Sequence, residues 1–174
     1  GRLAFPIYAF QLAEGTQRTK NPGRYLMRLG VFALLSELPF DLALHGGALT
    51  WSAQNIYWTL GLGAGAVMLY QRKGQPRILA WAWPAAAALL AEGMRADYGW
   101  YGVAVIFLFC LTLGNRQQRT AFKVVPLALQ ATAPLALLPI NSYRGVQGPR
   151  FRWLFYLFYP AHLLALYGTW LFMQ

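Results

Sequence analysis

His162 is the residue of this sequence best placed to do acid–base chemistry. It lies in the middle of an apolar stretch of 21 residues, 153–173, which is long enough to span a bilayer as a helix. An ionisable residue in such a stretch is costly and indicates function. Pro160 precedes it, frees a backbone carbonyl one turn earlier and bends the helix beside the imidazole. We predict that His162 is catalytic; the alternative is a packing histidine that donates one hydrogen bond.

A second group of ionisable residues is spaced four apart: Glu37, Asp41 and His45. On a continuous helix these side chains share one face, although Pro39 is expected to make the alignment approximate. A carboxylate beside an imidazole fixes its tautomer and raises its basicity, which prepares a general base. For Asp41 we predict a catalytic or structural polar role, and the alternative is a helix cap. We interpret His45 as a solvated loop residue.

The third candidate is a basic loop next to Glu14. It carries Arg18, Lys20, Arg24 and Arg28. Such cations bind anionic groups, either on a substrate or on lipid headgroups. Glu14 is expected to pair with Arg18 or Arg28, or else to line a site beside this loop.

Several other chemistries are not supported by the motifs. The two histidines form no His-x-x-x-His or Glu-x-x-His pattern, and Cys110 is the only cysteine, so we expect neither a metal nor a disulfide. Gly61, Gly63 and Gly65 lie within an apolar helical run without a preceding strand, which indicates close helix packing rather than dinucleotide binding. The net charge of +10 comes from short clusters between apolar runs, so we expect no nucleic-acid partner.

The composition indicates the elements that must hold these residues. Hydrophobic residues make up 57% and charged residues 11%, whereas soluble domains carry about 25% charge. Seven apolar segments are each predicted to be a helix, so the expected fold is a single all-α domain over 1–174, a polytopic transmembrane helix bundle in contact with membrane lipid. These segments are 1–14, 25–44, 53–70, 78–94, 98–114, 122–140 and 153–173. The chain opens without Met and its first segment is short, so we expect that one or two N-terminal helices are missing.

The distribution of Lys and Arg predicts the orientation of these helices. Alternate loops carry ten Lys or Arg residues against five on the other side, which places the richer loops in the cytoplasm. The ten are Arg18, Lys20, Arg24, Arg28, Arg72, Lys73, Arg77, Arg116, Arg119 and Lys123.

Both ends of the chain resemble the TraX family of integral membrane proteins, which includes the conjugative pilin acetylase. The similarity rests on GRLAFPIYAFQLAEG, the basic TQRTKNPGRYLMRL, FALLSELPFDL and FRWLFYLFYPAHLLALY. It is weak between 42 and 151. Members usually begin with a helix that carries an Asp-His pair, and this helix is absent here. The matched residues are Gly1, Arg2, Phe5, Pro6, Glu14, Arg28, Pro39, Asp41, Tyr159, Pro160 and His162.

The resemblance implies a multi-pass acetyltransferase of the bacterial inner membrane that uses acetyl-CoA. Its acceptor is an amine or hydroxyl, either a pilin-like peptide N-terminus or a cell-surface glycan or lipid. His162 is then the expected base, oriented by Asp41 or by the missing Asp-His pair. The residues expected to bind substrates are Arg2, Glu14, Arg18, Arg24, Arg28 and Tyr159. The rival functions are a small-molecule transporter and a non-catalytic membrane assembly protein.

Overall fold

The computed structural model describes residues 4–47, 50, 52–113, 133–143 and 152–173, and this part of the chain is helical without a strand. The all-α prediction is confirmed for these residues. The helices are α1 (Ala4–Arg18), α2 (Pro22–His45), α3 (Ile56–Tyr70), α4 (Arg77–Gly93), α5 (Gly99–Thr112), η1 (Ala133–Ala136), α7 (Leu137–Ser142) and α8 (Arg152–Phe172). Six of them coincide with predicted apolar segments. The segment 122–140 lies largely outside the described residues, and its described part forms η1 and the start of α7.

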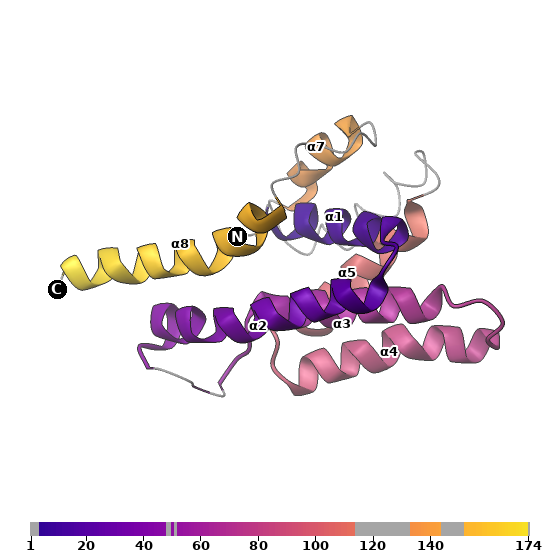
Figure 1. The fold of residues 1–174 in the computed structure, drawn as a ribbon, viewed down its shortest axis with the longest axis horizontal. Coiled ribbons are helices and arrows are strands. Elements are labelled where there is room, and N and C mark those ends of the chain that lie inside the picture. Colours follow the sequence, from indigo (N-terminus) through magenta and orange to yellow (C-terminus); the bar gives the residue numbers. More distant parts are fainter. Residues whose placement is uncertain (1–3, 48–49, 51, 114–132, 144–151, 174) are drawn as a thin grey trace.

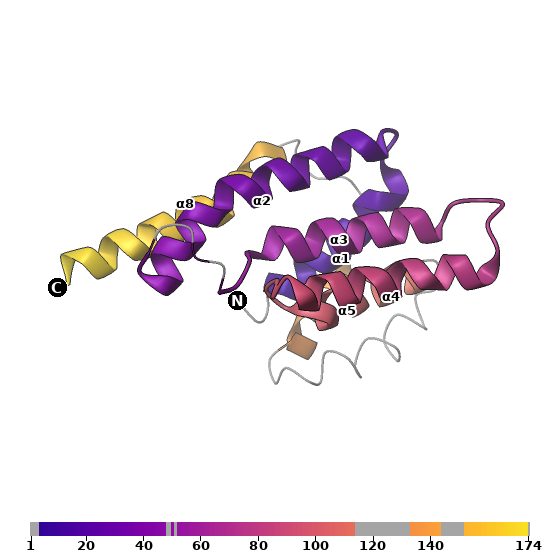
Figure 2. The ribbon, with the colours of Figure 1, turned by 90° about the horizontal axis from the view of Figure 1, so that it is seen from below.

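The bundle is built around α3, which packs against α2, α4 and α5. Helix α1 lies against α5 and α3, while α8 lies along α2 (Figure 1). In Figure 2, α2 lies between α8 and α3. The C-terminal half of α8 extends past the other helices in both views, so it is the N-terminal half that meets the bundle (Figures 1 and 2).

Small residues let α3 and α5 approach closely. A Cβ atom on Gly63 would lie 2.6 Å from Ile106 Cδ1, and one on Gly102 would collide with the Thr59 side chain. The predicted role of Gly63 in close helix packing is therefore confirmed. Gly61 and Gly65 have open space beside them, so the prediction of close packing is wrong for these two glycines.

Large apolar side chains cover much of the outer surface of α2, α4 and α8. Leu34 on α2 is 67% exposed, Leu89 on α4 is 76% exposed and Phe172 on α8 is 94% exposed. Among the described residues, no helix combines the length and the apolar character that crossing a bilayer requires.

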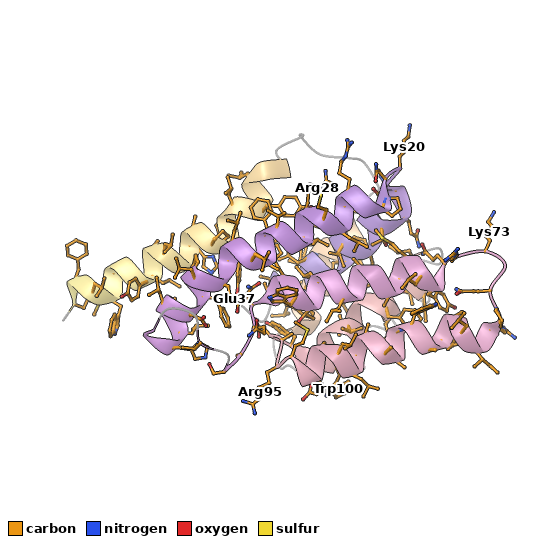
Figure 3. All side chains as sticks on the ribbon, turned by 60° about the horizontal axis from the view of Figure 1, so that its bottom comes forward. Lys20, Arg28, Glu37, Lys73, Arg95 and Trp100 are labelled. Carbon is orange, nitrogen blue, oxygen red and sulfur yellow. The ribbon has the colours of Figure 1, made fainter. Side chains whose placement is uncertain are left out.

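The two described basic loops lie at the same end of the bundle, as predicted. Figure 3 shows Lys20 in the α1–α2 turn and Lys73 in the α3–α4 turn at one end, and Arg95 in the α4–α5 turn at the other. The third predicted basic cluster, with Arg116, Arg119 and Lys123, lies outside the described residues.

Candidate functional site

Pro160 inside α8 joins this helix to α3. Proline has no N–H, so the carbonyl of Tyr156, one turn earlier, loses its helical donor. The hydroxyl of Tyr57 at the start of α3 donates to this carbonyl at 2.8 Å. The Tyr156 ring stacks on Phe32 of α2, with ring centroids 4.9 Å apart. The freed carbonyl predicted from the proline is thus used to fix α8 against α3.

The imidazole of His162 follows on the same helix and is half-buried. Its Nδ1 lies 3.1 Å from the carbonyl oxygen of Phe158. A carbonyl only accepts, so this contact is a hydrogen bond when Nδ1 carries the proton, and Nε2 is then an acceptor. The ring also stacks on Phe158 and meets the edge of Tyr159, at centroid distances of 5.3 and 5.4 Å. This arrangement can accept a proton at Nε2.

Tyr159 brings α8 to the carboxylates of other elements. Its ring packs edge-on against Tyr57, with centroids 5.4 Å apart. Its hydroxyl interacts electrostatically with Glu37 on α2 and Asp97 in the α4–α5 turn. Burial raises the pKa of the Asp97 carboxyl. The predicted site residues His162 and Tyr159 therefore contact each other on α8, and Tyr159 lies where it feels the charges of two carboxylates from other elements.

Glu37 was not among the predicted catalytic residues, yet it lies at this junction (Figure 3). Its Oε2 accepts hydrogen bonds from Asn55 Nδ2 and, at 3.1 Å, from Trp58 Nε1. Its Oε1 is buried and has no hydrogen-bond partner within the described part of the chain. One carboxylate oxygen is thus fixed by two donors, and the other is left to hold or take a proton.

Asn55 is a second residue that the sequence reasoning missed. Its Oδ1 caps α3 by accepting from the Tyr57 amide at 3.0 Å, and its Nδ2 also donates to the Ala33 carbonyl at 2.7 Å. The side chain is fully buried. An Asn before an apolar helical run is a recognisable N-cap, but its bonds to α2 depend on packing that no local pattern reveals.

Asp41 contacts His45, as the helical spacing suggested, and the loop after α2. Its side chain is fully buried and accepts from the Thr50 amide at 2.7 Å and from the Thr50 hydroxyl at 2.9 Å. Its Oδ1 lies 3.4 Å from His45 Nδ1. No hydrogen bond joins Asp41 to His162 among the described residues, so the structure does not support their pairing.

His45 is the last residue of α2, so the prediction that it lies in a loop is wrong. Helix α2 continues through Pro39, because a proline costs one helical hydrogen bond and the packing of α2 on α3 and α8 compensates for it. The predicted alignment of Glu37, Asp41 and His45 on one face is therefore kept. Below, these three residues are called the α2 polar column.

The predicted substrate-binding cations lie elsewhere, around the α1–α2 turn. Arg18 forms an ion pair with Glu14 at 2.9 Å, so of the two predicted partners of Glu14 it is Arg18 that binds it. Arg24 is exposed, and its amide donates to the α2 cap, Asn21. The Arg28 guanidinium lies over the Tyr25 ring at 5.7 Å, and its Nε is buried without a partner in the described structure. Arg2 lies outside the described residues.

The candidate residues thus form two groups along α2. Figure 3 shows Arg28 nearer the basic end and Glu37 farther from it. They are nine positions apart, which corresponds to a helical rise of about 13.5 Å. The structure does not join the basic group directly to His162.

An apolar cavity of about 400 Å³ lies between α2, α3 and α4. Gly30 and Ala33 line it on α2, Trp58 and Gly61 line it on α3, and Trp83 lines it on α4. Trp58 connects this cavity to the site, because its indole N–H bonds to Glu37. In the described residues, no three His, Cys, Asp or Glu side chains are grouped closely enough to hold a metal ion.

Comparison with known proteins gives two matches. The family model described as TraX protein matches residues 1–169. A curated protein of Dichelobacter nodosus, described as "Probable fimbrial assembly protein FimC, serogroup H1", is 27% identical over 206 residues, which cover 100% of this chain and 82% of that protein. No solved structure matches the chain.

Proposed function

This chain belongs to the TraX family, and from that premise we propose that it is an acetyltransferase of the bacterial inner membrane. It transfers the acetyl group of acetyl-CoA to an amine or hydroxyl acceptor. The family assignment rests on a match to nearly the whole chain. The activity, the donor and the location are proposals that the following observations support.

The observation that carries the proposal is the orientation of His162. With its proton on Nδ1, directed at the Phe158 carbonyl, the imidazole offers Nε2 as a base. Attack by an amine or hydroxyl on a thioester requires removal of a proton, and histidine is the side chain that does this near neutral pH. Tyr159 holds the ring from one side, and the unpartnered oxygen of Glu37 provides a further group that can hold a proton nearby.

The basic end of the bundle offers cations for the donor. Acetyl-CoA is polyanionic, and arginine binds phosphate through several donors at once. The buried, unpartnered Nε of Arg28 and the exposed Arg24 both lie at the start of α2. The charge of Arg18 is offset by its pairing with Glu14, so Arg18 would have to leave this pair to bind the donor. We propose that the nucleotide part of acetyl-CoA binds here and that the acetyl end extends along α2 toward His162.

A position in the membrane accounts for the apolar outer surface. Exposed leucines on α2 and α4 would be costly in water and are favourable against lipid tails. The end of the bundle that carries both basic loops then faces the cytoplasm, where acetyl-CoA is made. The bundle then crosses the membrane several times, and the α2 polar column lies toward the side away from the cytoplasm.

The acceptor is proposed from the relative. The Dichelobacter nodosus protein is described as a probable fimbrial assembly protein. We propose that this chain acts in pilus assembly or conjugation and that its acceptor is a pilin-like peptide, with a cell-surface glycan or lipid as the alternative. The same description favours a second function, in which the protein assists assembly without catalysis.

One experiment distinguishes these two functions. The purified full-length protein is incubated with acetyl-CoA labelled on the acetyl group. Labelled acetate and labelled protein or lipid are separated and counted, and the released CoA is measured through its free thiol. Turnover above that of the same preparation carrying His162→Gln supports the acetyltransferase. Binding without turnover, or no use of acetyl-CoA at all, favours the non-catalytic assembly protein.

A further inference from the structure

The α2 polar column leads from the buried junction at Glu37 to the surface at His45. Glu37 and Asp41 are four positions apart on α2 and therefore face the same side, and Asp41 lies 3.4 Å from His45 Nδ1. The His45 side chain is 27% exposed, whereas that of Asp41 is fully buried. The column is therefore a row of ionisable groups that begins inside the bundle and ends in contact with its surroundings.

The loop after α2 fixes the middle of this row. Thr50 donates to both Asp41 oxygens, through its amide and its hydroxyl. The Thr50 hydroxyl lies 3.2 Å from the Ser52 hydroxyl, which is exposed. Because Asp41 faces Nδ1 of His45, the imidazole is directed with Nε2 away from the carboxylate.

The proposed reaction needs such a row when the acceptor is an amine. At neutral pH the amine is an ammonium ion and must lose two protons. The N–C bond forms, the thioester C–S bond breaks, one proton goes to the sulfur of CoA, and the other must leave the protein. In the proposed position within the membrane, a site that releases one proton per turnover needs a route for it to solution.

We infer that His45, held by Asp41, is the residue that exchanges this proton with solution. The inference rests on the proposed acetyltransferase function. The proton passes from His162 past Tyr159, whose ring packs on Tyr57, to Glu37, which Trp58 of the same helical turn contacts, and then along the α2 polar column. Bridging waters carry it where two groups are beyond hydrogen-bond reach.

The ionisable groups along this route come from four elements. Helix α2 provides the α2 polar column, α3 provides Tyr57 beside Tyr159, α8 provides Tyr159 and His162, and the α4–α5 turn provides Asp97. The loop after α2 provides hydroxyls and the Asn55 amide, which carry no charge. His45 is the group of this set at the exposed end of the column.

Chemical rescue tests the inference. Turnover of acetyl-CoA by the purified full-length protein is measured in weak buffer, with glycinamide as the amine probe. His45→Ala should lower the rate by about 10²-fold, as expected for a lost proton-transfer group. Added imidazole should restore most of that rate, and the wild type should not respond to it. Leu44→Ala, a change at the exposed neighbour on the same turn, is the matched control and should keep the wild-type rate.

The outcomes separate the inference from the proposed function. If the wild-type protein does not turn over acetyl-CoA, the proposed function fails and the inference fails with it. If the wild type is active and His45→Ala is equally active, or is impaired without rescue by imidazole, the inference alone is overturned. His45→Gln, which keeps the size of the side chain, replaces His45→Ala if the latter does not fold, and the same rescue is required of it.

Discussion

The Tyr57 hydroxyl donates a 2.8 Å hydrogen bond to the Tyr156 carbonyl, a group that Pro160 leaves without its helical donor. The proline, usually a defect in a helix, thus creates the acceptor that fastens α8 to α3. The next turn of α8 carries His162, so the position of the imidazole depends on this bond.

Tyr57→Phe should destabilise the protein by about 1 kcal/mol, because it leaves a carbonyl without a donor and keeps the ring packing. In Pro160→Ala the helix supplies its own donor to this carbonyl. The cost of Tyr57→Phe should therefore be smaller in the Pro160→Ala background. A double-mutant cycle from thermal unfolding measures the difference, and equal costs in both backgrounds would show that the two residues are not coupled.

Asn55→Ala should destabilise the protein by more than the loss of a helix N-cap alone would. The change removes the α3 cap and the bonds to Ala33 and Glu37, so we expect a loss of more than about 2 kcal/mol. Asn21→Ala, which removes the exposed cap of α2, is the matched control and should cost about 1 kcal/mol. Unfolding midpoints of the two variants test this ranking, which equal losses would contradict.

His162→Gln should lower acetyl transfer by about 10²–10⁴-fold and leave the unfolding midpoint nearly unchanged. The amide keeps the size and a hydrogen bond but cannot take a proton near neutral pH. Thr169→Ala, on an exposed position of α8, is the control and should retain activity. Full activity of His162→Gln would make this histidine a packing residue.

Arg28→Gln should weaken acetyl-CoA binding more than Lys73→Gln does. Both residues lie toward the basic end, but the Arg28 Nε is buried and unpartnered while Lys73 is exposed. Adding Arg24→Gln should weaken binding further. The losses should be larger at low salt, where attraction between charges is less screened. Titration calorimetry at two salt concentrations measures this; unchanged affinity would move the donor site elsewhere.

Asp97→Asn should stabilise the protein near neutral pH. Burial raises the pKa of the Asp97 carboxyl above its ordinary value, so the folded state holds this proton more tightly than the unfolded state. The stability that this proton contributes is fully present below the ordinary pKa of Asp97. It is lost as the pH rises through the higher pKa of the folded state. The advantage of Asp97→Asn over wild type should therefore grow between about pH 4 and 7. Unfolding midpoints across this range test the trend.

The sequence predicts the helices well, because long apolar runs determine where they lie. It also predicts the alignment of Glu37, Asp41 and His45, which follows from helical spacing. This spacing also accounts for the contact between Asp41 and His45, but it does not predict the other partners. Asn55 reaches Glu37 from 18 positions away, and Asp41 accepts from Thr50 and does not bond to His162 in the described structure. Such pairings depend on how α2 packs against α3 and on the course of one loop, and no local pattern encodes either.

The bond between Tyr57 and Tyr156 also joins residues 99 positions apart. A chain leaves the ribosome from its N-terminus, so α2 and α3 are synthesised long before α8. Until then Tyr57 lacks its acceptor and Phe32 lacks the ring that stacks on it. The site is therefore completed last, and a product released early would carry Glu37 and Asp41 without Tyr159 or His162.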